Sequence, residues 1–84
     1  MKVTLYTKPD CPLCDEFKEE LLALQAASSF TLIERNIEED AGDFERYRYL
    51  IPVLDIENGQ VLHPPHAWQR TEAALNEASA ISQR

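Results

Sequence analysis

The two cysteines of this chain, Cys11 and Cys14, lie three positions apart in the segment Cys-Pro-Leu-Cys. Thiols at this spacing on the first turn of a helix are close enough to form a disulfide. Such a disulfide closes a very short loop and constrains the unfolded chain little, so a structural staple explains the pair poorly. In a reducing compartment, C-x-x-C between a strand and a helix is typical of a redox pair. The spacing therefore predicts thiol–disulfide exchange.

The two thiols are not equivalent in this arrangement. Pro12 suits the first position of a helix, which places Cys11 at the N-cap. A Cys11 thiolate there accepts hydrogen bonds from the free N–H groups of Leu13 and Cys14 and lies at the positive end of the helix. We therefore expect Cys11 to attack a partner disulfide and Cys14 to resolve the mixed disulfide, with no bound cofactor.

The elements that position the cysteines follow from the hydrophobic pattern. Residues 2–7 alternate between apolar and polar side chains, which predicts a strand. A helix is predicted from about Pro12 to Ala27, followed by a second strand over about 30–36. The predicted buried stripe of this helix consists of Leu13, Phe17, Leu21 and Leu24.

The second half of the chain begins with a short helix that Asp43 is predicted to cap and that ends at about Tyr49. Its inward residues are predicted to be Phe44 and Tyr47. Residues 51–56 and 60–62 form an antiparallel pair, because Asn58-Gly59 between them is a strong hairpin signal.

A final amphipathic helix is predicted from about Ala67 to Ser82. Its apolar side consists of Ala67, Thr71, Ala74, Leu75, Ala78 and Ile81. The predicted order is therefore β-α-β-α-β-β-α in a single domain over residues 1–84. This order predicts an α/β fold with a four-stranded mixed sheet and three helices packed on its faces.

The charge of the chain narrows the range of partners. Eight basic and fifteen acidic residues give a net charge of −7, which opposes binding to nucleic acids and to anionic membrane surfaces. Neutral or basic protein partners fit better. The sequence offers neither an apolar run long enough to span a membrane nor a signal peptide, so we expect a cytoplasmic protein. We also expect the protein to be a monomer.

The segment from Tyr6 to Cys14, Y-T-K-P-D-C-P-L-C, resembles the glutaredoxin active-site segment Y-T-K-x-x-C-P-Y-C, and Leu50-Ile51-Pro52 is similar to the glutaredoxin T-V-P. The resemblance covers essentially the whole chain in element order and implies a thioredoxin fold. It also implies that Pro52 is cis and faces the cysteines, and that the Ile51 backbone pairs with an incoming peptide or glutathione. From the residues alone, Pro52 fits a trans proline that opens an edge strand equally well.

Two further segments bear on the substrate. Lys8 matches the glutaredoxin lysine that meets a substrate carboxylate, although a solvated surface lysine fits the sequence as well. Leu13 replaces the usual tyrosine, and residues 63–68 replace the glutaredoxin Gly-Gly and acidic residue that hold glutathione. We therefore expect glutathione to be a weak co-substrate. The expected substrate is a disulfide-bearing protein or a small thiol compound, and a flavoprotein reductase is the alternative electron donor.

The histidines of the loop at 63–66 raise the question of zinc. The gap from Cys14 to His63 is far longer than the roughly 12 to 15 residues of a zinc finger, and Pro64-Pro65 prevents a helical H-x-x-H arrangement. We therefore expect no metal and two solvated histidines, His63 and His66. Trp68 is predicted to lie in the core under this loop, whereas an exposed tryptophan would mark a partner surface.

A different class of function also fits the sequence. A thioredoxin-fold binding or scaffold module would carry its cysteines incidentally, or would hold an iron–sulfur cluster between two subunits through Cys11. Reversible formation of an internal disulfide favours the oxidoreductase, whereas redox-silent thiols or a coloured dimer favour the binding module.

Overall fold

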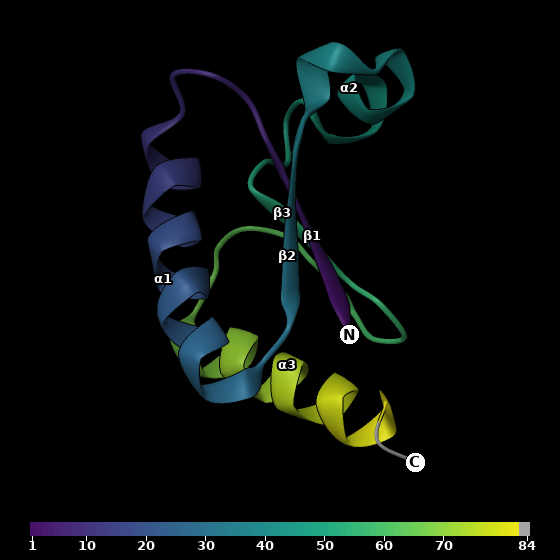
Figure 1. The fold of residues 1–84 in the computed structure, drawn as a ribbon. Coiled ribbons are helices and arrows are strands. Elements are labelled where there is room, and N and C mark those ends of the chain that lie inside the picture. The colour runs from purple at the N-terminus through teal and green to yellow at the C-terminus, as the bar shows by residue number, and fades with distance from the viewer. Residues whose placement is uncertain (83–84) are drawn as a thin grey trace.

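Four strands form one mixed sheet in the order β2-β1-β3-β4 (Figure 1). The structure is a computed structural model that describes residues 1–82, with side chains described as far as residue 80. The strands are β1 (Lys2–Thr7), β2 (Thr31–Asn36), β3 (Val53–Ile56) and β4 (Val61–Leu62). Strand β1 is parallel to β2 and antiparallel to β3, and β4 is antiparallel to β3. The predicted antiparallel hairpin is therefore confirmed.

Three helices connect or follow these strands, as predicted. They are α1 (Pro12–Ser28), α2 (Ala41–Tyr47) and α3 (Trp68–Ser82). A short 3-10 helix that was not predicted, η1 (Ile37–Glu39), precedes α2. Helix α1 provides the long connection that two parallel neighbouring strands require. No helix among residues 1–82 is long and apolar enough to cross a membrane.

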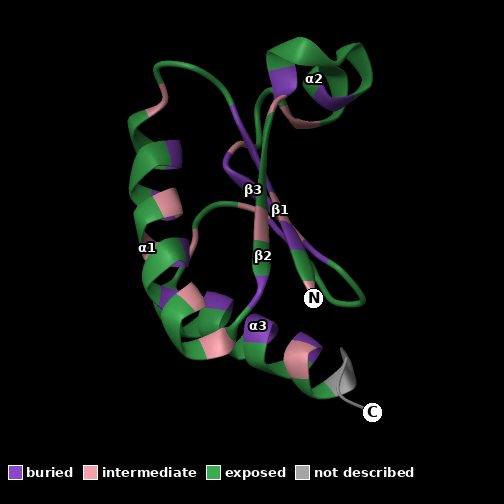
Figure 2. Ribbon diagram, viewed as in Figure 1, coloured by how far each residue is buried: buried purple, intermediate pink, exposed green. Residues whose placement is uncertain are grey.

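The alternation of side chains along the strands separates two cores. Val3 and Leu5 of β1 and Leu54 and Ile56 of β3 belong to the larger core, which α1 and α3 cover. Tyr6 and Val53, which point the other way, form a smaller core with Ile37 of η1, against which Tyr47 and Ile51 pack. This division follows from the two-residue period of a strand. Figure 2 shows that β2 and α2 are mostly exposed, so the well-buried part of the sheet is β1 and β3.

Helix α1 buries one side, but its first buried residue differs from the prediction. Cys14, Phe17, Leu21 and Leu24 are buried, whereas Leu13 is 65% exposed. The prediction for Leu13 was therefore wrong. Leu13 lies four residues and Cys14 three residues before Phe17, and both spacings allow one helix face, so the pattern alone could not decide between them. The structure turns Cys14 inward, where its sulfur joins that of Cys11.

The capping residue of α2 also differs from the prediction. Asp40, not Asp43, is the N-cap, and its side chain accepts a hydrogen bond from the Asp43 N–H at 2.9 Å. This hydrogen bond, the largest influence, holds the pKa of Asp40 below its usual range. Asp43 is instead buried in the first turn, where Arg35 and Arg46 each place a nitrogen 3.1 Å from its carboxylate. The two arginines compensate a charge that would otherwise be too costly to bury, and Arg46 also donates a hydrogen bond to Asp43 Oδ1.

The inward side of α2 was predicted only in part. Tyr47 packs against Tyr6 with ring centroids 4.6 Å apart, whereas Phe44 is 37% exposed and lies beneath the Arg48 guanidinium. The prediction for Phe44 was therefore wrong, and α2 ends two residues earlier than the predicted Tyr49. A helix of seven residues can turn little surface toward the sheet.

Helix α3 packs its small residues against the larger core. Thr71, Ala74, Leu75 and Ala78 are buried as predicted, and Ala67 is exposed and precedes the helix. The Ile81 side chain lies outside the described residues. Trp68 was predicted to be a core residue, but it is 40% exposed at the first position of α3, so that prediction was wrong.

The hairpin between β3 and β4 packs closely against α3 at Gly59. A Cβ atom at Gly59 would lie 3.0 Å from Ile56 Cγ2 and 3.2 Å from Ala78 Cβ. We expect Gly59→Ala to lower the free energy of unfolding by about 1–3 kcal/mol, because the surrounding side chains must move apart. Urea denaturation measures this change.

Gly42→Ala is the matched control. A Cβ at Gly42 would meet the exposed side chain of Asp40 at 3.2 Å, which can move, and alanine favours a helix by about 1 kcal/mol over glycine. We therefore expect this variant to be as stable as the wild type or more stable. Equal destabilisation by both substitutions would contradict the close packing at Gly59.

Candidate functional site

The two cysteines lie where β1 ends and α1 begins. Strand β1 ends at Thr7, and Cys11 is the N-cap of α1, with extended backbone angles (φ −117°, ψ 96°) and Pro12 in the first turn. Asp10, which precedes Cys11, has a φ of 59°, so the chain turns sharply before it enters the helix. Cys11 and Cys14 form a disulfide with their Cα atoms 5.2 Å apart. The predicted pairing of the two sulfurs is therefore present.

The two sulfurs differ in access and in hydrogen bonding. Cys14 is 2% exposed, whereas Cys11 is partly exposed. The Cys14 N–H points at Cys11 Sγ, at an N to S distance of 3.2 Å. The acceptor here is a disulfide sulfur, which accepts weakly; in the reduced protein a Cys11 thiolate would occupy this position. The same N–H and the positive end of α1 would stabilise that thiolate.

The segment before β3 lies at the same end of the sheet. Val53, the first residue of β3, pairs with Tyr6 near the end of β1. The Ile51–Pro52 peptide bond immediately before it is cis, as the resemblance to glutaredoxins implied. Pro52 is buried, and Ile51 is half-buried against the smaller core. The Ile51 N–H donates to the Tyr47 carbonyl at 3.1 Å.

His66 joins three segments at this end of the molecule. Its ring stacks on Phe17 of α1, with centroids 3.8 Å apart and an angle of 6° between the planes. Its Nε2 lies 2.6 Å from the Pro52 carbonyl oxygen. Because a carbonyl oxygen only accepts, Nε2 carries the hydrogen. His66 was predicted to be a solvated loop residue, and that prediction was wrong.

The environment of His66 favours its neutral form. Burial lowers the pKa of His66 below its usual range, and the nearby Arg70 and His63 act in the same direction. The hydrogen bond to Pro52 and the charge of Glu20 oppose this shift, but burial is the largest influence. Nδ1 of His66 is buried without a hydrogen-bond partner, so a proton there would have no acceptor.

His63 is also not the solvated side chain that was predicted. It is half-buried, and its Nδ1 has no hydrogen-bond partner. Its carbonyl oxygen accepts a hydrogen bond from Arg70 at 3.1 Å, which fastens the loop to α3. The Pro64–Pro65 bond in this loop is cis as well.

A groove of about 450 Å³ opens beside the disulfide. Leu13, the residue between Pro12 and Cys14, lines it together with Pro52, so the cysteine turn and the cis-proline segment share one cavity. Its lining consists of Leu13, Glu16, Phe17, Glu20, Pro52, Pro64, Pro65 and His66.

Lys8 lies in a different cavity. This cavity, of about 640 Å³, lies between the turn after β1 and the end of β2, and most of its charged side chains are acidic. Lys8 is exposed, as a solvated lysine would be, and it does not line the groove that contains Pro52. The structure therefore brings Cys11, Cys14, Leu13 and Pro52 to one end of the sheet. Lys8 lines the neighbouring cavity and not the groove that contains Pro52.

Two residues of this site lacked a sufficient signal in the sequence. Phe17 was predicted only as a core residue, but its ring also stacks on the ring of His66. The partner of His66 is a backbone carbonyl 14 residues earlier in the chain, and no sequence motif marks such a contact. The two prolines before His66 were a weak signal, because they make the loop rigid enough to hold a side chain in place.

Comparison with known proteins agrees with this architecture. The family model described as "Glutaredoxin-like domain (DUF836)" matches residues 2–77. The X-ray structure of the structural genomics target protein XcR50 from X. campestris is 35% identical, with a TM-score of 0.73 over 89% of this chain and 96% of that chain. The solution structure of XcR50 gives 35% identity and a TM-score of 0.70 over 92% and 95% of the two chains.

A more distant structure shares the fold. Thioredoxin 1 from Thermosipho africanus TCF52B is 11% identical, with a TM-score of 0.74 over 100% of both chains. The predicted thioredoxin-like fold is therefore confirmed.

The lowered pKa of His66 predicts a pH dependence of stability. A histidine whose pKa is lower in the folded state contributes stability above its unfolded pKa of about 6.5, and this contribution is lost as the pH falls below that value. We expect the free energy of unfolding of the wild type to fall between pH 7.5 and pH 5.5. His66→Gln, which cannot titrate, should lack this part of the fall and should be less stable at pH 7.5 by about 1 kcal/mol or more.

His63→Gln is the matched control, because it removes the other imidazole of the same loop. Chemical denaturation at several pH values measures all three proteins. If the wild type and His66→Gln lost stability in parallel on acidification, the neutral, buried state of His66 would be refuted.

Proposed function

The chain belongs to the glutaredoxin-like domain family (DUF836), and from that premise we propose that it is a thiol–disulfide oxidoreductase that carries electrons through Cys11 and Cys14. One observation carries the proposal: a partly exposed Cys11 at a helix N-cap is disulfide-bonded to a Cys14 that is only 2% exposed. This is the arrangement that an attacking and a resolving thiol require.

The proposed reaction proceeds in two exchanges. The Cys11 thiolate attacks one sulfur of a substrate disulfide, the substrate S–S bond breaks, and the other substrate sulfur leaves as a thiolate that takes up a proton. Cys14 then loses its proton and attacks Cys11 Sγ, which releases the second substrate thiol and forms the Cys11–Cys14 disulfide. The substrate gains two electrons and two protons. The electrons come from the two thiols of the protein, one proton comes from Cys14, and the other comes from the solvent, to which Cys11 released its own proton on forming the thiolate.

The segment at Ile51 and Pro52 is proposed to receive the substrate backbone. The Ile51 N–H already donates to Tyr47, so a substrate that pairs through the Ile51 carbonyl would leave this bond intact. Pro52 lines the groove in which the substrate residues beside the reacting cysteine would lie. Lys8, in the neighbouring cavity, is proposed to meet a substrate carboxylate that extends around this edge.

The proposed substrates are disulfide-bearing proteins or small thiol compounds. A net charge of −7 argues against nucleic acids and anionic membranes as partners. We propose that the protein acts as a monomer, because one chain supplies both thiols and the groove beside them.

The unequal access of the two sulfurs predicts unequal variants. We expect Cys11→Ser to lower the rate of reduction of hydroxyethyl disulfide to the uncatalysed level, because the buried Cys14 cannot reach the substrate. Cys14→Ser should still attack but should accumulate a mixed disulfide on Cys11. Intact-protein mass spectrometry before and after reduction measures this adduct.

Limited alkylation of the reduced wild type provides an independent readout. We expect a label on Cys11 before one on Cys14. Faster labelling of Cys14, or an adduct on Cys11→Ser, would reverse the two roles.

Glutathione fits the charges of this end of the molecule poorly. Glutathione is anionic and needs cations for its carboxylates. Glu16 and Glu20 line the groove beside the disulfide, and Lys8 lies among acidic side chains. Arg46 is paired with Asp43. We therefore propose that glutathione is a weak reductant and that a flavoprotein reductase supplies the electrons.

A coupled assay with glutathione, glutathione reductase and hydroxyethyl disulfide tests this proposal. We expect a kcat/KM at least about ten-fold below that of an ordinary dithiol glutaredoxin, since each poorly placed charge costs up to about 1 kcal/mol. Dithiothreitol, which is uncharged, is the control reductant and should reduce the Cys11–Cys14 disulfide of the isolated protein. Equal turnover with glutathione would show that the loop at 63–66 accommodates it.

A further inference from the structure

The groove beside the disulfide has two unlike walls. Helix α1 forms one wall with two apolar and two acidic side chains, namely Leu13, Phe17, Glu16 and Glu20. Three prolines, Pro52, Pro64 and Pro65, line it from the other segments. His66 links the walls, because it stacks on Phe17 and donates to the Pro52 carbonyl. The groove therefore offers apolar surface opposite a line of negative charge.

The two carboxylates of this groove lack cationic partners among the residues whose side chains are described. Among the described residues, ion pairs form at Glu34 with Lys18 at 3.1 Å, at Asp43 with Arg35 and Arg46, and at Asp40 with Arg35 at 3.9 Å. Neither Glu16 nor Glu20 has an ion pair within the described part of the chain. His66 is held in its neutral form by burial.

Arg70, at the start of α3, does not neutralise these carboxylates, because it forms no ion pair with either of them. Arg70 of α3 influences His66, but its guanidinium donates to the His63 carbonyl at 3.1 Å. A cation from a partner can therefore approach both carboxylates without displacing one that is already bound.

The spacing of the two carboxylates suits an extended peptide. Glu16 and Glu20 are four residues apart on α1, which corresponds to about 6 Å along the helix axis. Side chains two positions apart in an extended peptide are about 6.6 Å apart and point to the same side, while the residue between them points to the other side. A basic–apolar–basic triplet that runs along α1 would place its cations at Glu16 and Glu20 and its apolar side chain against the prolines.

We propose that this groove selects protein substrates in which an extended basic–apolar–basic segment lies next to the reacting cysteine. The proposal rests on the proposed function, since Leu13 and Pro52 place the groove beside the disulfide. Lysine or arginine of the substrate binds Glu16 and Glu20, and a leucine-like side chain between them packs on Pro52, Pro64 and Pro65. Glu16 and Glu20 thus determine specificity without taking part in thiol exchange.

Single-turnover reduction of three cysteine peptides tests the proposal. Each is a symmetric disulfide and carries Lys-Leu-Lys, Glu-Leu-Glu or Lys-Ser-Lys after its cysteine. We expect the reduced wild type to react about five-fold or more faster with Lys-Leu-Lys than with Glu-Leu-Glu at low salt, as two exposed ion pairs allow. This preference should shrink in 0.5 M NaCl at a Debye length of roughly 4 Å. Lys-Ser-Lys should be slower than Lys-Leu-Lys, because it leaves the proline wall without an apolar contact.

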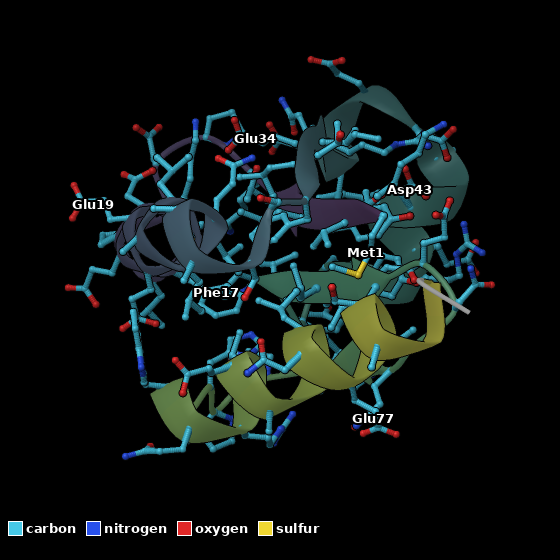
Figure 3. All side chains as sticks on the ribbon, turned by 60° about the horizontal axis from the view of Figure 1, so that its bottom comes forward. Met1, Phe17, Glu19, Glu34, Asp43 and Glu77 are labelled. Carbon is cyan, nitrogen blue, oxygen red and sulfur yellow. A yellow bond between two sulfur atoms is a disulfide. The ribbon has the colours of Figure 1, made fainter. Side chains whose placement is uncertain are left out.

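A matched pair of double variants separates the groove from the overall charge. Glu16→Gln/Glu20→Gln should lose the preference for lysine over glutamate. Glu19→Gln/Glu77→Gln changes the net charge equally but should keep the preference, because both residues are exposed and neither lines the groove. Figure 3 shows Glu19 and Glu77 pointing outward, away from the side of α1 on which Phe17 lies. Equal loss of preference in both double variants would overturn the proposal.

The same experiment distinguishes the two proposals. Reduction of hydroxyethyl disulfide together with equal rates for all three peptides would refute the groove and leave the oxidoreductase intact. Failure to reduce any disulfide would refute the oxidoreductase.

In that case, NMR of the oxidised protein with serine-substituted peptides still tests the groove. The Lys-Leu-Lys peptide should shift the Leu13 methyl and His66 ring resonances, and the Glu-Leu-Glu peptide should not. Shifts that appear on concentrating the protein alone would identify a second copy as the occupant and overturn the proposal.

Discussion

The central position of β1 is the constraint on which this structure depends. Its neighbours β2 and β3 pair with it along both edges, and side chains on both of its faces are buried. Such a strand cannot shift by one residue without turning Val3 and Leu5 away from the larger core. Its end at Thr7 therefore fixes where the chain can turn into α1, and the pairing of Tyr6 with Val53 fixes where Pro52 lies. The cysteine pair and the cis-proline lie at the same end of the sheet because one strand positions both.

Local signals were sufficient for this framework. Alternation predicted β1, Pro12 predicted the start of α1 with Cys11 as its N-cap, and Asn58-Gly59 predicted the hairpin. Each of these signals depends on a few consecutive residues and on a backbone preference that tertiary contacts support here. The cis state of Pro52 needed more, because the residues alone fitted cis and trans, and the family resemblance decided correctly.

The predictions that failed depend on choices that a helical period leaves open or on distant partners. Leu13 and Cys14 both suited the inner side of α1, and Asp40 and Asp43 both suited the cap of α2. In each pair the second residue is the buried one, because its side chain interacts with a partner outside its own helix period. Cys14 forms a disulfide with Cys11, and Asp43 forms ion pairs with Arg35 and Arg46. His66 is half-buried for the same reason. Its partners are the ring of Phe17 on α1 and the carbonyl oxygen of Pro52, which precedes β3.

The distribution of charge completes the picture of the site. Arg35 and Arg46 lie at the same end of the sheet as the cysteines, but on the side of α2, where they pair with the buried Asp43. Arg48 lies over the ring of Tyr49, with its Cζ 4.6 Å from the centroid. These cations are not available to the groove beside the cysteines. Glu16 and Glu20 therefore keep their negative charge uncompensated beside the disulfide, and the proposed selectivity depends on this placement of cations away from the groove.

The direction of β1 also determines how the protein can be attached to something else. The Met1 carbonyl accepts a hydrogen bond from Thr31 at 2.9 Å, so the strand is held from its first residues (Figure 1). The six residues of β1 place its two ends about 17 Å apart. A dye, an electrode linker or a neighbouring domain joined before Met1 is therefore held at the end of the sheet opposite to Cys11. Immobilisation through the amino terminus would present the disulfide to the solution, whereas a linker within the loop at 63–66 would displace His66 from Pro52.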